Sequence, residues 1–392
     1  MWSRSPCAGT SARPAIRRVC VTLCFRRGFE VRARLSARQN TFQQGFSLVE
    51  LMVAMLIGLI LIAGVIQIFL GSNQTYRFTE GSSRVQENAR FALDTLQREL
   101  RMAGYRGCTR NITSWLDVPA GSSWEDLIGG APVTGWEATG SAPGNQLDLP
   151  ATAGWANGTA AAVPATIPTA RLPGSDILVI NAGQVLDLQA TATQNASSAE
   201  ISLTSANNLA GDAIVLAIAG DCSGGDLWQK QNAPNSTNLS RGSGGAPGNT
   251  APQSTPFANL HGEETQFLAF RSTAYYLASN PAGQPALYRV RLDPAGGAAE
   301  EVVEGVESMQ VLYGVDLNGN RQVDEYRTAL QVTDWQQVVS VRVGLLFRTP
   351  EESAGELDSR QYDVIGTRIN PVDDRRLRKV AVTTVALRNR LP

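Results

Sequence analysis

The feature that most constrains this chain is a run of 25 residues, Phe46 to Leu70, whose only charge is Glu50. A helix rises about 1.5 Å per residue, so about 20 apolar residues can cross the hydrocarbon core of a bilayer. No second stretch of comparable length and apolarity follows in the 392 residues. The sequence therefore predicts one membrane-spanning helix near the N-terminus, followed by a body on one side of the membrane.

Charge is distributed unevenly on the two sides of this run. Residues 1–45 hold nine arginines and one acidic residue, which leaves 25 basic and 34 acidic residues in the rest of the chain. Positively charged flanks of a membrane helix stay in the cytoplasm. We therefore expect a cytoplasmic N-terminus and an external body, and the acidic body argues against nucleic acid as a partner.

A cleaved secretory signal peptide is the competing interpretation of an apolar run behind a basic region. It fits poorly, because the run exceeds the usual length of about 7–15 residues and no A-x-A-like site follows it directly. A carboxylate inside a membrane helix costs roughly 2.5–3.5 kcal/mol at the bilayer centre and less near a helix end. Glu50 is therefore expected to be functional, and a glutamate that simply faces the headgroups is the alternative.

The residues GFSLVE, from Gly45 to Glu50, resemble the N-terminal signature of type IV prepilins and type II secretion pseudopilins. In that family a prepilin peptidase cuts after the glycine and methylates the new amino terminus. The resemblance implies cleavage between Gly45 and Phe46, loss of residues 1–45 as a cytoplasmic leader, and an N-methylated Phe46. It also implies that residues 46–70 remain, first as an inner-membrane anchor and then as the filament core.

The resemblance also assigns a role to Glu50. This carboxylate lies about one helical turn from the Phe46 amine, and a buried carboxylate is tolerated when a cation pairs with it. In the family that cation is the terminal amine of a neighbouring subunit, which sets the axial register during assembly.

Helical periodicity continues beyond the membrane run. Apolar residues recur at spacings of three and four, which predicts an amphipathic continuation over residues 71–106; they are Val85, Ala89, Leu93, Leu96 and Leu100. Gly104 and Gly107 indicate its end, since glycine accepts the left-handed conformation that closes a helix. Gly71 and Gly81 suggest a bend within it.

The remaining residues, 107–392, are expected to form one periplasmic head. Residues 107–260 are rich in small and polar residues and predict a low-complexity insertion, with short strands at 176–180, 200–204 and 212–218 and a flexible loop at 230–256. Stronger strand patterns at 265–276, 286–292, 308–315, 338–347 and 378–387 predict an antiparallel sheet. The predicted fold is α+β and pilin-like: a long N-terminal helix packed against a β-rich head with long insertions.

Four segments resemble PilW-type minor pilins: QENARFALDTLQRELRMAGYRGC, VEGVESMQVLYGVDLNGN, VVSVRVGLLFR and DDRRLRKVAVTTVALRNRLP. The resemblance implies a minor pilin of the type IV pilus that primes polymerisation with other minor pilins and the major pilin. It also implies that the subunit can sit at the pilus tip with an adhesin.

Two cysteines, Cys108 and Cys222, would be the only ones left after loss of the leader, and both would lie on the oxidising side of the membrane. A bridge between them would close a loop of about 115 residues, worth nearly 5 kcal/mol as an upper guide in the chain-entropy model. We expect this disulfide, with two buried free thiols as the alternative.

The segment VDLNGNRQVDEYR has the oxygen spacing of a calcium loop; its candidate ligands are Asp316, Asn318, Asn320, Gln322 and Asp324. Against calcium, Arg321 stands where such loops need glycine, and Arg327 stands where they need a bidentate acid. Asn-Gly is also a strong hairpin turn without any ion. A plain turn and a calcium site both stay open, and no other cofactor is expected.

No enzyme signature is present in the sequence. The only histidine, His261, has no evident nucleophile or zinc-ligand partner, and it is expected on the surface or in a loop. We therefore predict that the protein is not an enzyme. The alternatives are a type II secretion minor pseudopilin and, in a different class, a membrane-tethered periplasmic enzyme or binding protein.

Overall fold

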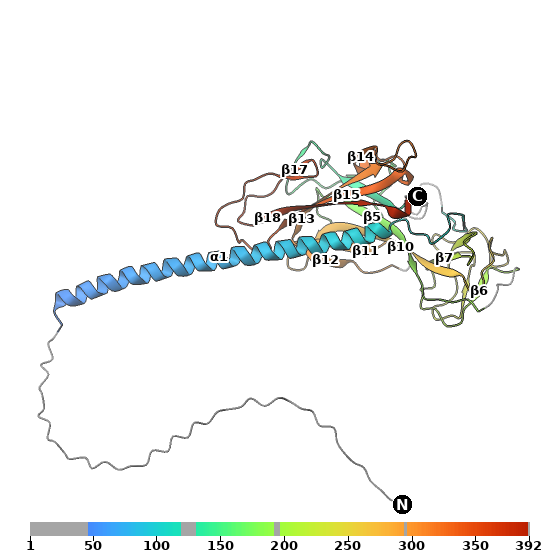
Figure 1. Ribbon diagram of the computed structural model, residues 1–392, viewed down its shortest axis with the longest axis horizontal. Helices are drawn as coiled ribbons and strands as arrows, with labels where there is room; N and C mark the ends of the chain where they lie inside the picture. The colour runs from blue at the N-terminus through green and yellow to red at the C-terminus, as the bar shows by residue number, and fades with distance from the viewer. Residues whose placement is uncertain (1–45, 119–130, 192–196, 294–295, 391–392) are drawn as a thin grey trace, which may run out of the picture. The chain divides into compact units, whose positions relative to one another are not determined.

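Helix α1 (Leu48–Met102) is the longest element of the structure, a computed structural model that describes residues 46–118, 131–191, 197–293 and 296–390 (Figure 1). Its 55 residues include no proline, and two glycines with left-handed backbone, Gly104 and Gly107, follow it. Glycine adopts this conformation at no steric cost, so the helix can end there. The predicted long helix is confirmed, and it ends at Met102, four residues before the predicted bound of 106.

The chain divides into two compact units, residues 1–63 and 64–392, and each is described by itself. In the first unit, the large apolar side chains of α1 are exposed by between 50% and 76%. In the second unit, α1 buries one face, formed by Val85, Ala89, Ala92, Leu96 and Leu100. This is the face that the helical periodicity predicted, except that Ala92 is fully buried and Leu93 only partly.

An antiparallel sheet of four strands forms the C-terminal part of the second unit, in the order β14-β13-β15-β18. Its strands are β13 (Val306–Val315), β14 (Glu325–Arg327), β15 (Val338–Arg348) and β18 (Arg378–Ala386). β15 pairs with β18 along its length without a register shift, from Ser340 opposite Ala386 to Arg348 opposite Arg378. Three of the five segments predicted to form one antiparallel sheet, 308–315, 338–347 and 378–387, lie in this sheet. The other two, 265–276 and 286–292, lie in a separate nine-stranded sheet, so the prediction of a single sheet was wrong.

A nine-stranded sheet forms most of the remaining head, in the order β1-β8-β7-β10-β5-β2-β4, with β11 beside β10 and β12 beside β11. Its strands are β1 (Ile112–Ser114), β2 (Val133–Ala138), β4 (Trp155–Ala156), β5 (Ile177–Val185), β7 (Ile214–Ile218), β8 (Gly225–Gln229), β10 (Gln266–Ser279), β11 (Pro285–Arg291) and β12 (Glu300–Glu304). All neighbours are antiparallel except β1 and β8.

Two small sheets and three short helices complete the described elements. One sheet contains β3 (Gln146–Asp148), β16 (Tyr362–Val364) and β17 (Thr367–Asn370); the other contains β6 (Glu200–Ser202) and β9 (Asn238–Ser240). The 3-10 helices are η1 (Ala329–Gln331), η2 (Trp335–Gln337) and η3 (Arg388–Arg390).

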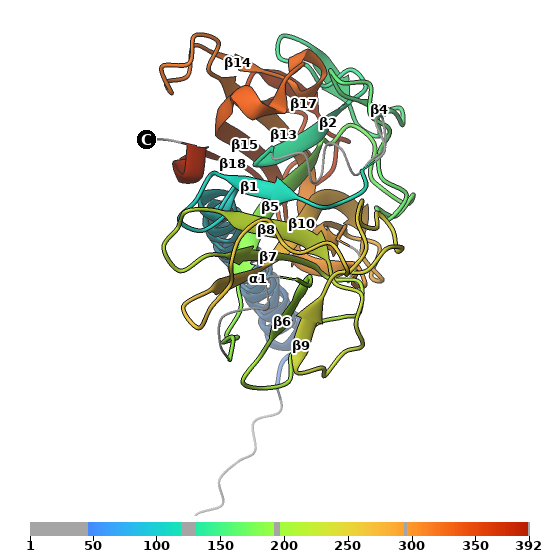
Figure 2. The same cartoon turned by 90° about the vertical axis from the view of Figure 1, so that its right-hand side faces the viewer.

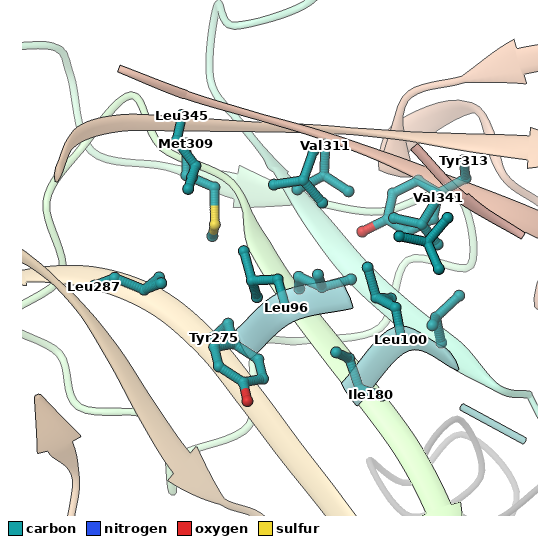
Figure 3. Packing of buried hydrophobic residues seen from close by; sticks show 14 of the residues in the cluster. Leu96, Leu100, Ile180, Tyr275, Leu287, Met309, Val311, Tyr313, Val341 and Leu345 are labelled. Atoms are coloured by element: carbon teal, nitrogen blue, oxygen red, sulfur yellow. The ribbon is translucent and has the colours of Figure 1, made fainter. Parts of the chain in front are cut away.

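The main apolar core lies between α1 and both large sheets. Figure 3 shows Leu96 and Leu100 of α1 between Met309 and Val341 of the four-stranded sheet and Leu287 of the larger sheet. These side chains are all essentially excluded from solvent. A helical stripe of leucines and alanines therefore joins the two sheets into one head.

The segment 230–256, predicted to be a flexible loop, contains a short strand. This strand is β9, which pairs with β6. Leu239 of β9 is fully buried in a third apolar cluster with Trp228 and Phe267. β9 has three residues, too few for an alternation of apolar and polar side chains to be recognised from the sequence. The surrounding residues are glycines, serines and asparagines, which are typical of loops.

Gly81 allows a close approach of two segments and does not bend α1. A Cβ atom at this position would lie 3.0 Å from the side chains of both Ser353 and Thr349, in the loop that follows β15. The helix runs through Gly81 without interruption. The glycine therefore lets that loop pack directly on the helix backbone.

Candidate functional site

The start of α1 holds the residues predicted to act in processing and assembly. Phe46 and Ser47 precede the helix, and the Leu51 N–H donates to the Ser47 carbonyl at 3.1 Å. Glu50 lies in the first turn with an exposed side chain. Its carboxylate makes no hydrogen bond or ion pair within the described residues, and Gly45 lies outside them.

One helix of the described chain, α1, is long and apolar enough to cross a membrane. Its most apolar window of 18 residues has a mean hydropathy of 2.8, and none of that window is buried. Length and composition therefore fit a membrane anchor, as the sequence predicted.

A disulfide joins Cys108 to Cys222, with Cα atoms 5.7 Å apart. Cys108 follows the end of α1, and Cys222 lies in the turn from β7 to β8, where its N–H donates to the Ala219 carbonyl at 2.8 Å. The bond spans a sequence separation of 114 residues. It ties the end of α1 to the turn between β7 and β8 of the nine-stranded sheet.

The predicted oxygen-rich loop connects β13 to β14 and is closed by its own hydrogen bonds. The Asp316 carboxylate accepts the backbone N–H groups of Gly319 at 2.8 Å and Arg321 at 2.7 Å. The Asp324 carboxylate accepts the side-chain amide of Asn318 at 2.8 Å. These contacts describe a hairpin turn, and the calcium site at these residues stays a prediction.

His261 lies in a loop, as expected, but it is buried and not on the surface. Its Nε2 is 2.9 Å from Oδ2 of Asp226, and both side chains are fully buried. The same carboxylate accepts the Trp115 indole N–H at 2.6 Å and the backbone N–H groups of Ala258 and Asn259 at 2.9 and 3.0 Å. His261 therefore has a partner, Asp226, which could not be recognised from the sequence because it lies 35 residues earlier in the chain.

The hydrogen bonds of Asp226 hold the loop that contains Ala258, Asn259 and His261. Burial alone would raise the pKa of Asp226, but the hydrogen bonds from His261, Trp115 and Asn259 outweigh it and hold that pKa below its ordinary value. The other imidazole nitrogen, Nδ1, has no partner among the described residues. A hydrolytic triad needs a nucleophile beside the imidazole, and no described hydrogen bond supplies one.

Two buried cations hold the segment that was predicted to be flexible. Lys230 donates to the carbonyls of Asn232 at 2.6 Å and Ala233 at 3.0 Å. The Arg241 guanidinium stacks on the Trp115 ring, 3.8 Å from its centre. Burial lowers the pKa of both cations. The residue that precedes the glycine-rich stretch 242–248 is therefore buried and held by Trp115.

A buried pair of carboxyl groups, Glu137 of β2 and Asp176 before β5, connects the two large sheets. The Ser141 hydroxyl lies 3.2 Å from Glu137 Oε1 and 3.1 Å from Asp176 Oδ1. Asp176 also accepts the N–H of Ala138 at 2.9 Å and that of Val311, in β13, at 2.8 Å. One carboxyl group thus bonds to strands of both sheets.

Both carboxyl groups of this pair have raised pKa values. Burial and the nearby Asp176 raise the pKa of Glu137 to about 9, and burial raises the pKa of Asp176 to about 7. Among the described residues Glu137 Oε2 has no hydrogen-bond partner, whereas Asp176 accepts several hydrogen bonds, so the charged form is stabilised less at Glu137 than at Asp176. The sequence analysis missed this pair, and its one signal is an acid inside the apolar segment VTGWEA.

Comparison with protein families gives two matches at opposite ends of the chain. Residues 274–389, which run from within β10 to beyond β18, match the family described as Type IV Pilus-assembly protein W. Residues 40–66 match the prokaryotic N-terminal methylation motif, which includes Gly45, Phe46 and Glu50. The apolar helix and the N-terminal motif fit a membrane-anchored pilin, and the C-terminal match is to a family of pilus-assembly proteins.

No curated protein matches the chain. A solved structure that is similar is a type IV-like pilin from Thermus thermophilus, with 16% sequence identity over 48% of this chain and 89% of that chain. Its TM-score is 0.23, a value too low to support an argument about this head.

Proposed function

We propose that this chain is a minor pilin of the type IV pilus and that it primes pilus polymerisation together with other minor pilins. The observation that carries the proposal is the presence of both matches on one chain, the methylation motif at 40–66 and the pilus-assembly protein W match at 274–389. Both belong to structural proteins of pili, and they imply other pilus components as partners.

Processing is the first step of the proposal. A prepilin peptidase cuts between Gly45 and Phe46 on the cytoplasmic side of the inner membrane and methylates Phe46. Glycine at the cut lets the peptidase approach the backbone, because it has no side chain in the way. The mature subunit then spans the membrane once through α1, with its head in the periplasm.

Assembly is the second step. The exposed Glu50 carboxylate pairs with the Phe46 amine of a neighbouring subunit as α1 enters the filament core. A charge in apolar surroundings is stabilised by a paired opposite charge and is costly without it, so this pair sets the axial register. The subunit joins other minor pilins, then the major pilin, and stays at the pilus tip with an adhesin.

The decisive test of processing is the N-terminus of the protein purified from membranes. Mass spectrometry should find methylated Phe46 as the first residue of the natural chain. Gly45→Arg should leave the leader attached, whereas Gly45→Ala should be cut at least partly. A normally cut and methylated Gly45→Arg protein would contradict the prepilin assignment.

The test of assembly compares three Glu50 variants in a strain that lacks the natural gene. Deletion should remove surface pili, and loss of protein secretion with normal pili would indicate a pseudopilin. Glu50→Ala and Glu50→Gln should be processed and inserted but fail to restore pili, because each lacks the charge. Glu50→Asp should be intermediate, and normal piliation with Glu50→Ala would rule out the register role.

A further inference from the structure

β18 leaves one long edge of the four-stranded sheet unpaired. It is the last strand in the order β14-β13-β15-β18, and among the described residues β15 is the one strand bonded to it. Its sequence after Lys379 is VAVTTVA, which has no charge and no proline. Unpaired N–H and C=O groups on such a strand are a template for another strand.

Other sheet edges in the described head are short or already engaged. β14 and β1 have three residues each, and β4 has two. The acidic strand β12 has five residues; its Glu304 carbonyl accepts from Asn88 of α1 at 3.2 Å, and its Glu300 carboxylate pairs with Arg289 of β11 at 2.7 Å. β18, with nine residues and no bulge against β15, is the exception.

A groove of about 600 Å³ lies at the end of β18, between the last turns of α1 and η3. Gln97 of α1 donates to the Thr383 hydroxyl at 2.8 Å and fixes the helix beside the strand. Figure 2 shows β18 near the chain's C-terminus, on the outer side of β15. A strand added to β18 would therefore run along α1 into this groove.

The groove is positively charged. Its lining contains Arg98, Arg101 and Arg388, with Asp94 as the one acidic side chain, and Asp94 lies 3.9 Å from Arg90. The three arginines make no ion pair within the described residues. Unpaired cations beside a free strand edge fit an anionic partner.

We propose that the free edge of β18 and the arginine-lined groove at its end bind an extended, acidic segment of a different pilin subunit by β-strand addition. Backbone hydrogen bonds to β18 give affinity, and carboxylates against Arg98, Arg101 and Arg388 give specificity and direction. This chain's own acidic strand is engaged internally, so a second copy does not supply the segment. That the partner is a pilin rests on the proposed function.

The test uses the full chain in its own membranes, with a photo-crosslinking amino acid at Val382, which is 47% exposed on β18. The matched control carries the same amino acid at Leu330, which is 54% exposed in η1. We expect an adduct from position 382 alone, and mass spectrometry should place it on an acidic extended segment of a protein with a prepilin motif.

Charge reversal then separates specific binding from chance proximity. Arg98→Glu with Arg101→Glu should reduce the adduct at least tenfold, whereas the two lysine substitutions should retain most of it. Arg84→Glu, on the same helix but outside the groove, should leave it unchanged. Reversing the acids of the identified segment should restore the adduct with the glutamate variant.

Three results would overturn the inference: no adduct at position 382, an adduct with a second copy of this chain, or insensitivity to charge reversal. The N-terminus of the same purified protein distinguishes the two proposals. A methylated Phe46 and pili that depend on this gene, with no adduct, would reject the strand addition alone. An uncut leader would reject the proposed function itself.

Discussion

The C-terminal sheet and the middle of the head are held together by different kinds of side chain. Every residue of β13 is buried, and the core cluster around it consists mainly of valine, leucine and alanine. In the middle, between residues 108 and 261, buried charges and amides carry much of the packing, as in the pair of Asp226 and His261 and the cation Lys230. The sheet depends mainly on packed volume, with one buried ion pair between Arg378 of β18 and Glu307 of β13, whereas the middle depends more on matched hydrogen bonds.

This difference teaches how each region should respond to substitution. An apolar core tolerates changes that conserve volume and is damaged by cavities. A buried polar network is damaged by any change that leaves a donor or acceptor without its partner, even where the shape is kept. The distinction between the two regions would be wrong if both lost the same stability on cavity formation and on loss of a hydrogen-bond partner.

The largest effect is expected for Asp226→Ala. This change would leave the buried donors of His261 and Trp115 without an acceptor, and breaking such a buried pair costs roughly 3–5 kcal/mol. Urea unfolding of the mature chain in detergent should show this loss in the free energy of unfolding. Asp117→Ala, at an exposed position nearby, is the control and should change it by less than about 0.5 kcal/mol; equal effects would remove the distinction.

In the C-terminal sheet, Leu345 provides the matching test of volume. It lies in β15 and is fully buried in the main core cluster, so Leu345→Ala should cost roughly 2–5 kcal/mol by creating a cavity. Leu345→Met conserves volume and should cost less than about 1.5 kcal/mol. If the methionine variant were as unstable as the alanine variant, the sheet would not be governed by volume.

The disulfide should stabilise the middle more than the sheet. Cys222→Ser should reduce the free energy of unfolding by about 2–4 kcal/mol, because it releases a long loop in the unfolded chain. Cys108→Ser should have the same effect, and the double variant should be no less stable than either single one. Non-reducing electrophoresis checks the bond, and faster migration before reduction is expected.

The last expected effect is a dependence of stability on pH, and it concerns the carboxyl pair that links the two regions. The pKa of Glu137 is raised to about 9, so the folded state keeps a proton that the unfolded state has lost above about pH 4. Stability should therefore fall as the pH rises from about 5 towards 9, by at most about 1.4 kcal/mol per pH unit for that proton.

The glutamine variant checks this direction. Glu137→Gln cannot lose a proton, so its free energy of unfolding should vary less between pH 5 and pH 9 than that of the natural chain. Asp176, whose pKa is raised to about 7, should still contribute part of the slope. A natural chain that becomes more stable over this pH range would contradict the assignment of the proton.

The same comparison explains how much could be predicted from the sequence. The helix, its end and the strands of the C-terminal sheet follow from the spacing of apolar residues, which depends on local geometry alone. β13, β15 and β18 were predicted within two residues of their observed bounds. The N-terminal motif was readable for the same reason, since its residues are contiguous.

The polar middle could not be predicted in this way. Asp226, Trp115 and His261 come together from three separate segments, and no periodicity relates them. Strands such as β8, with the sequence GDLWQ, mix glycine, a buried acid and an amide, so their burial is invisible without the fold. Polar contacts between distant residues are a property of the tertiary structure.

The position of the disulfide has a mechanical consequence for a subunit that is pulled through α1. Tension entering at the end of the helix reaches Cys108 first and crosses the sulfur bridge to Cys222, so it bypasses the 114-residue separation between them. At about 3.4 Å per extended residue, this protects roughly 390 Å of contour length. In single-molecule stretching, reduction of the bond should release that extra length, and the polar middle would then be the first part to unravel.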